Sequence, residues 1–296
     1  MRKFESSWDN GDFSFTKVFL TLLLVFGAFI LGNMPLMLLY PSDRGQTMAD
    51  LVAYFGFSSL FLLQMIPFVF GLLGLVTSAK YVHKTSPLAW FTSRNKIDIN
   101  RIVFSFFLWA LLVIIPTIID WLLFPSTYTV QSDFLPFLET FFLLAVCLPF
   151  QVLFEELLFR GFIFQGLAKR TKSAIFAVIV SGIMFGMMHI GNPEVRSEGF
   201  GLLGIYITLG VSISLMAWLD QGIEIAFGFH LANNFITGIL VTSEDQAFQT
   251  HALLKMESLN LSFGSILILL LSILIFFVVC YKRFHWGSWF SLRNNH

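Results

Sequence analysis

Long apolar runs constrain this chain more than any other feature of its sequence. A helix needs about 20 mostly apolar residues to cross the hydrocarbon core of a bilayer. Eight such runs follow one another along the chain: 18–39, 51–79, 102–124, 140–168, 173–190, 199–219, 225–242 and 258–281. We therefore expect an all-α polytopic membrane protein with about eight transmembrane helices, and a single transmembrane domain over residues 1–296.

The composition supports this class and excludes others. The chain is 56% hydrophobic and 12% charged, whereas an average soluble domain has about 25% charged residues. Lys plus Arg and Asp plus Glu are equal at 18 each, so no net field attracts polyanions and nucleic acid is not an expected partner. Cys147 and Cys280 both lie within apolar runs, which argues against a disulfide framework.

The Lys and Arg residues between the apolar runs predict the orientation. With the N-terminus inside, fourteen of them fall in cytoplasmic segments and three in outer loops. Cytoplasmic loops carry the excess of Lys and Arg in membrane proteins, so we expect both termini to be cytoplasmic. The short tails and low charge are typical of a multi-pass protein of a prokaryotic plasma (inner) membrane. Prolines and Glu139 interrupt the start of the fourth run, and we expect a separate interfacial helix at 134–144.

Ionisable side chains deep inside the apolar runs are few, and each is costly in lipid unless it has a partner. They are Asp120, Glu155, Glu156, Arg160, His189 and His230. Five of the six lie in the fourth, fifth and seventh runs, in the segment 146–242. We expect the functional site in this segment.

Glu155 and Glu156 point to different sides of their helix, because neighbouring residues are turned by about 100°. Glu156 and Arg160 are four residues apart in the order that favours an ion pair, so we interpret them as a structural pair. Glu155 has no such partner in its own helix. It is the better candidate for a general base.

The fifth run ends with Phe185 and His189 on one helix face. Gly182 and Gly186 in the same run form a pair of small residues that lets another helix approach closely. We expect His189 to project into the site, with Phe185 beside it.

His230 and Asn234 share a face of the seventh run. Helix rise places Glu155, His189 and His230 about 21, 25 and 15 Å from the inner surface, which is compatible with one site. Such a set suits hydrolysis of an acyl bond: Glu155 takes a proton from water, His189 orients the water, and His230 and Asn234 donate to the oxyanion. Glu155, His189 and His230 are also able to ligate a metal.

Other readings of the same residues stay open. The Glu, Arg and His residues can serve only to hold helices together, as in a membrane scaffold without catalysis. Buried Glu and His groups also relay protons or cations in transporters. Such transporters often show two half-repeats, and the sequence has no internal repeat.

Three patterns occur in order on separate helices: Glu-Glu-x-x-x-Arg at 155–160, Phe-x-x-x-His at 185–189 and His-x-x-x-Asn at 230–234. Together they resemble the signature of the CPBP family of CaaX proteases and bacteriocin-processing enzymes, also called the type II CaaX prenyl endopeptidase or ABI family. The resemblance implies an intramembrane endopeptidase with about eight helices. It also implies that Glu155 and His189 activate water and that His230 and Asn234 form the oxyanion hole.

The resemblance implies a membrane-associated protein or peptide as substrate, met within the lipid bilayer. Prenylated CaaX proteins, leader peptides and membrane-bound regulators all fit it. We favour a site without a cofactor, and Glu155, His189 and His230 are the ligands if zinc is used.

Overall fold

Helices make up most of the computed structural model, which describes residues 3–6, 13–41, 45, 47–256 and 262–286. In this part of the chain, seven helical stretches are long and apolar enough to cross a membrane. They are Phe15–Leu39, Phe57–Val82, Ile99–Leu123, Phe134–Thr171, Ala174–Gly191, Phe200–Asp220 and Phe263–Phe284. The protein is thus an all-α polytopic membrane protein, as the apolar runs predict.

These stretches contain α1 (Phe15–Leu39), α3 (Phe57–Thr77) with η2 (Ser78–Val82), α5 (Ile99–Leu123), α6 (Phe134–Glu156) with η4 (Leu157–Phe164) and α7 (Gln165–Thr171), α8 (Ala174–Met187) with η5 (Met188–Gly191), α10 (Phe200–Asp220) and α12 (Phe263–Phe284). Shorter helices are η1 (Phe4–Ser6), α2 (Met48–Phe55), α4 (Pro87–Phe91), η3 (Pro125–Thr127) and α9 (Pro193–Glu198).

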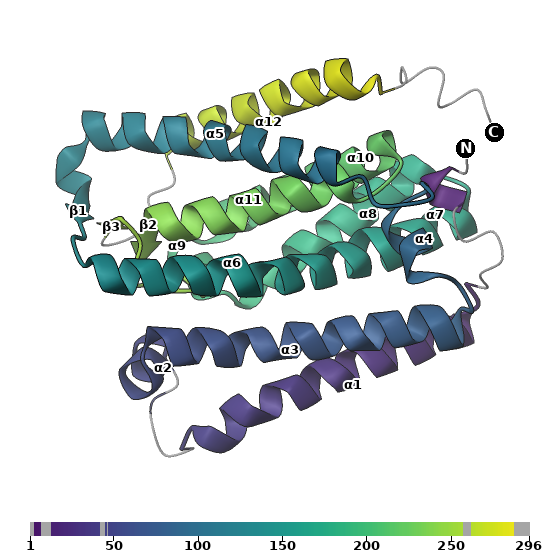
Figure 1. The fold of residues 1–296 in the computed structure, drawn as a ribbon, viewed down its shortest axis with the longest axis horizontal. Helices are drawn as coiled ribbons and strands as arrows, with labels where there is room; N and C mark the ends of the chain where they lie inside the picture. Colours follow the sequence, from purple (N-terminus) through teal and green to yellow (C-terminus); the bar gives the residue numbers. More distant parts are fainter. Residues whose placement is uncertain (1–2, 7–12, 42–44, 46, 257–261, 287–296) are drawn as a thin grey trace.

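The expected seventh span corresponds to α11 (Glu224–Leu240), which has 17 residues. This length is at the lower limit of what crosses a bilayer, about 17–25 residues. The helix lies within the bundle and packs against α5, α6 and α10 (Figure 1). Its close fit to α5 depends on Gly228, where a Cβ would lie 2.3 Å from the carbonyl oxygen of Ile102. The count of eight spans stays a prediction.

The fourth stretch is one continuous helix from Phe134 to Thr171. The prediction of a separate interfacial helix at 134–144 is wrong, because α6 runs on through Pro149 without a break. Directly after Glu156 the helix widens into the π-helical segment η4. Such segments are rare in proteins, and those that occur often lie at functional sites.

The two ends of the bundle carry different elements (Figure 1). The strand end carries α2, α9 and a small sheet of β1 (Tyr128–Val130), β3 (Leu254–Met256) and β2 (Val241–Ser243), in that order. Strand β3 pairs antiparallel with β1 and parallel with β2, and Lys255 is opposite both Thr129 and Thr242.

The opposite, basic end carries α4, α7 and the described ends of the chain (Figure 1). The Lys and Arg residues of the segments expected to be cytoplasmic gather here: Lys3, Lys17, Lys80, Lys84, Arg94, Lys96, Arg101, Lys169, Arg170, Lys172, Lys282 and Arg283. Arg2, Arg44 and Arg293, which also entered the orientation prediction, lie outside the described residues. The cytoplasmic placement of the termini stays a prediction.

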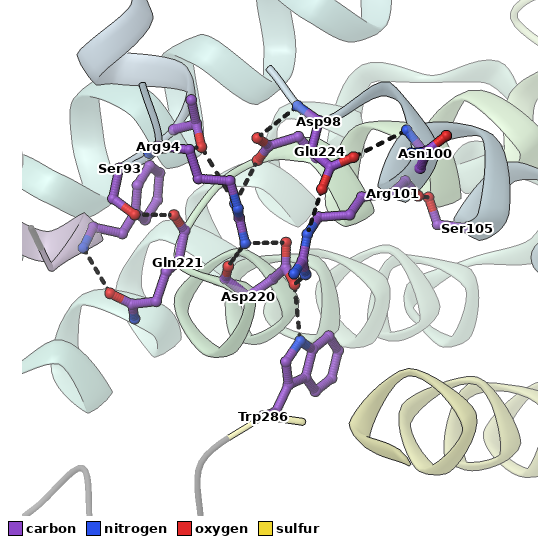
Figure 2. A network of polar contacts seen from close by, with 12 residues as sticks. Ser93, Arg94, Asp98, Asn100, Arg101, Ser105, Asp220, Gln221, Glu224 and Trp286 are labelled. Atoms are coloured by element: carbon purple, nitrogen blue, oxygen red, sulfur yellow. Dashed lines mark hydrogen bonds and ion pairs between the residues drawn. The ribbon is translucent and has the colours of Figure 1, made fainter. Parts of the chain in front are cut away.

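Ion pairs close the basic end (Figure 2). Asp220, the last residue of α10, binds Arg94 at 3.3 Å, binds Arg101, and accepts a hydrogen bond from the indole of Trp286 at 2.9 Å. Glu224, the first residue of α11, binds Arg94 at 3.1 Å. Both carboxylate side chains are fully buried. The network therefore joins the α4–α5 connection, the α10–α11 connection and the residues after α12.

Helices α8 and α10 approach so closely that their contact tolerates only glycine. A Cβ on Gly182 would lie 2.5 Å from Cα of Val211, and one on Gly186 would lie 2.6 Å from Cα of Ile207. Backbone atoms cannot move aside as side chains do, so these two glycines set the separation of the helices. Their contact positions the end of α8, where the histidine of the site lies.

Candidate catalytic site

Three helices carry the residues that the sequence singled out. Glu155 and Glu156 end α6 and Arg160 lies in η4, while Phe185 belongs to α8 and His189 to η5; His230 and Asn234 lie on α11. The structure brings Glu155, Glu156, His230 and Asn234 into one contact network, described below. His189 and Phe185 line the same cavity as Glu155 and Asn234.

Glu156 connects α6 to α11. One of its oxygens, Oε1, accepts hydrogen bonds from Arg160 at 3.0 Å and from Nδ1 of His230 at 2.7 Å. Arg160 further donates to Oγ of Ser214 at 3.2 Å and to the carbonyl of Gly210 at 2.8 Å. Glu156 and Arg160 are completely buried. The pair thus does more than neutralise two charges, because it also holds His230.

The His230 ring is fixed from several sides. With Nδ1 donating to Glu156, its Nε2 lies 3.5 Å from Oε2 of Glu155 and 3.3 Å from Nδ2 of Asn234. The edge of the ring meets Phe185, with 5.4 Å between ring centroids. Phe185 in turn lies beneath the guanidinium of Arg160, at 4.6 Å. Phe185 therefore packs between the ion pair and the imidazole.

A chain of amides leads to the other oxygen of Glu155. The indole of Trp109 donates to Asn233 at 3.2 Å, and Asn233 donates to Asn234 at 3.3 Å. Asn234 donates to Gln151 at 3.2 Å, and Gln151 donates to Oε1 of Glu155 at 2.5 Å. An indole N–H can only donate and a carboxylate can only accept. The two ends of the chain therefore fix the orientation of every amide between them.

Glu155 is left with one anchored and one available oxygen. Among the described residues, no hydrogen-bond donor reaches its Oε2, which is buried from solvent. His230 stands at ion-pair distance from this oxygen without making a hydrogen bond. The carboxylate thus has a fixed position and a free acceptor site.

His189 is held by contacts that the sequence does not predict. Its Nδ1 lies 3.0 Å from the carbonyl of Phe185, and because a carbonyl only accepts, Nδ1 carries the proton and Nε2 keeps a lone pair. Its ring stacks on Tyr206, with centroids 4.2 Å apart. Tyr206 donates to the buried carboxylate of Glu194 at 2.8 Å.

Glu194 links three segments at the strand end of the bundle. It accepts from Asn192 at 2.8 Å and from the backbone N–H of Ala247 at 3.0 Å, in addition to Tyr206. Sequence reasoning missed Glu194 and Tyr206. A polar residue five positions after His189 is a weak signal for Glu194, and a tyrosine in an apolar helix gives none.

A cavity of about 470 Å³ opens beside these groups. Its polar wall includes Glu155, His189, Asn234, Glu194 and Tyr206. The apolar wall includes Phe26 and Phe29 of α1, Phe68 of α3, and Leu144 and Leu148 of α6. His230 is only 4% exposed. It contacts Glu155 and Asn234, which line the cavity. An apolar cavity with a few convergent polar groups is typical of a substrate site.

The described residues contain no preformed group of ligands for a metal ion. Within the described residues, no cluster of three or more His, Cys, Asp or Glu side chains is arranged to hold a metal ion. Glu155 and His230 approach each other, as given above, and His189 directs its protonated Nδ1 to a backbone carbonyl. The choice between a metal and a metal-free site stays a prediction.

Comparison with known proteins agrees with the motifs. Residues 136–236 match the family model described as type II CAAX prenyl endopeptidase Rce1-like. The chain is also 27% identical over 256 residues to the uncharacterized protein YyaK of Bacillus subtilis (strain 168), an alignment that covers 81% of this chain and 82% of that protein. No solved structure matches. The resemblance to the CaaX-type proteases that the three motifs predict is confirmed, and it lies over the segment that carries them.

Proposed function

We propose that this chain, whose residues 136–236 are Rce1-like, is an intramembrane endopeptidase that cuts membrane-associated proteins or peptides with water activated by Glu155. The family match supports a protease embedded in a membrane. The observation that carries the mechanism is the state of Glu155: Gln151 anchors Oε1, while Oε2 has no described hydrogen-bond donor and belongs to a residue that lines the cavity.

The first step is the activation of water. A small turn of the Glu155 side chain brings Oε2, which is buried in the structure, to the cavity, where a water molecule donates one hydrogen to it and the other to the lone pair on Nε2 of His189. Glu155 takes the proton as the water oxygen attacks the carbonyl carbon of the substrate. A base held at hydrogen-bond reach of the nucleophile typically contributes about 10²–10⁴-fold to the rate.

The second step is stabilisation of the oxyanion. The amide of Asn234 has two hydrogens, one donated to Gln151 and the other directed at Nε2 of His230, 3.3 Å away, from which it turns to the oxyanion. His230, whose Nε2 lies beside the amide of Asn234, is the proposed second donor to the oxyanion. Loss of one such donor typically costs about 10²–10³-fold in kcat.

Collapse of the tetrahedral intermediate completes the reaction. The C–N bond breaks, and Glu155 returns its proton to the leaving nitrogen. One water is consumed, and the products are a new carboxyl terminus and a new amine. The chain's own groups thus supply every proton transfer, and we favour a reaction without a cofactor in the plasma membrane of a prokaryote.

The experiment is a comparison of protein N-termini in membranes that contain the parent enzyme or Glu155→Gln. Glutamine keeps the size and the hydrogen bond to Gln151 but cannot take a proton, so new N-termini should appear only with the parent. Glu139→Gln is the matched control, because Glu139 is an exposed carboxylate on the same helix. Cleavage by Glu155→Gln within tenfold of the parent, about 1.4 kcal/mol of barrier, would show that Glu155 is not the base.

A further inference from the structure

We propose that the cavity is reached from the extracytoplasmic side, so that the substrate is an apolar segment of a membrane-bound protein or peptide exposed in the outer half of the bilayer. That the occupant of the cavity is a substrate rests on the proposed function. The location of the cavity rests on the structure alone.

The cavity lies in the half of the bundle next to the strand end. Its walls include the first half of α10 at Leu202 and Tyr206, and the second half of α11 at Thr237 and Gly238. The connection between β2 and β3 contributes further lining residues, of which Gln246 is one. All of these segments lead into the strand end in Figure 1.

At the basic end, the described residues fill the corresponding space with a polar network. There the network of Figure 2 fills the space between α10, α11 and the α4–α5 connection, with both carboxylate side chains fully buried. Trp286 is 5% exposed and lies over Asp220. A substrate that came from this end would have to break several buried ion pairs.

Charge assigns the two ends to the two sides of the membrane. Twelve described Lys and Arg side chains gather at the basic end, whereas Arg196 and Lys255 are the cations of the described connections at the strand end. Lys and Arg in short loops stay on the cytoplasmic side. The strand end, and with it the cavity, therefore faces away from the cytoplasm.

The charges of the cavity wall also restrict what can enter it. The described lining residues include the carboxylates Glu155 and Glu194 and no Lys or Arg. A free C-terminal carboxylate would find like charges and no cation in this space. The cavity suits an uncharged or cationic stretch, which is cut at an internal bond.

The test uses two single cysteine variants of the full-length chain in intact cells. Gln246→Cys places a thiol on the cavity wall in the β2–β3 connection, and Thr171→Cys places one at the exposed end of α7 without changing any charge. The parent chain measures the background from Cys147 and Cys280. A membrane-impermeant maleimide should label Gln246→Cys in intact cells and Thr171→Cys only after permeabilisation.

Labelling of Gln246→Cys only after permeabilisation, or equal labelling of both variants in intact cells, overturns the proposal. Repeating the labelling in Glu155→Gln separates the two questions, because accessibility does not need activity. If the enzyme cuts but Gln246→Cys is protected, the orientation is wrong and the proposed function stands. If Gln246→Cys is labelled but nothing is cut, the orientation is supported and the proposed function is wrong.

Discussion

Replacing Glu156 tests how one buried carboxylate serves both the fold and the site. Glu156→Gln keeps the side-chain shape and an acceptor oxygen but leaves the fully buried Arg160 without the carboxylate that neutralises it. Breaking a buried ion pair on one side typically costs about 3–5 kcal/mol. We expect Glu156→Gln and Arg160→Met each to lose stability of this order.

The double variant Glu156→Gln/Arg160→Met should be more stable than the sum of the single losses predicts, because no uncompensated charge remains. Activity should follow a different pattern. Arg160→Met keeps the hydrogen bond from His230 to Glu156, so its folded fraction should cut within tenfold of the parent. Both variants without the carboxylate should lose about 10²–10³-fold in kcat, since His230 loses the charged acceptor that positions it.

Thermal unfolding in detergent measures the first effect, and cleavage per folded molecule measures the second. The reasoning is refuted if both single variants unfold at the parental temperature, or if the double variant regains parental kcat.

Three further predictions concern packing, positioning and metal. Gly186→Ala should cost about 1–3 kcal/mol of stability through overpacking against Ile207, while Gly204→Ala, whose Cβ meets nothing within 4 Å, should unfold like the parent; equal melts for the two would contradict the close contact. Gln151→Leu removes the anchor of Glu155 and should lower kcat roughly 100-fold with little change in KM; an unchanged kcat would exclude the amide chain from positioning. After exhaustive chelation the enzyme should still cut, and elemental analysis that finds stoichiometric zinc in step with activity would overturn this.

The helices and the class of the protein could be predicted, because they depend on local composition. The apolar runs specify where helices form, and the spacing of Glu156 and Arg160 places them together within one helix. Proline misled the prediction at 134–144. In a membrane helix neighbouring groups satisfy the freed backbone, and α6 accommodates Pro149 as α1 and α3 accommodate Pro35 and Pro67.

The site was harder to predict, because its contacts join residues far apart in the chain. Glu156 and His230 are separated by 74 positions, so no local spacing shows that this carboxylate holds that imidazole. Glu194 and Tyr206 escaped for a similar reason, since their roles depend on a stack against His189 and on a backbone N–H at Ala247. Gln151 is four residues before Glu155, so here the helical spacing alone indicates the contact.

The order of the strands has a consequence for how the enzyme is made. Strand β3 is the last of the three to be synthesised, yet it is the middle strand of the sheet, between β1 and β2. The ribosome has therefore released every proposed catalytic residue, up to Asn234, before the sheet can form. The β2–β3 connection, which carries Ala247 to its bond with Glu194, is also completed only then. A chain still being synthesised therefore holds the proposed catalytic groups without a finished cavity wall, so the order of synthesis itself delays completion of the site until the β2–β3 connection has been made.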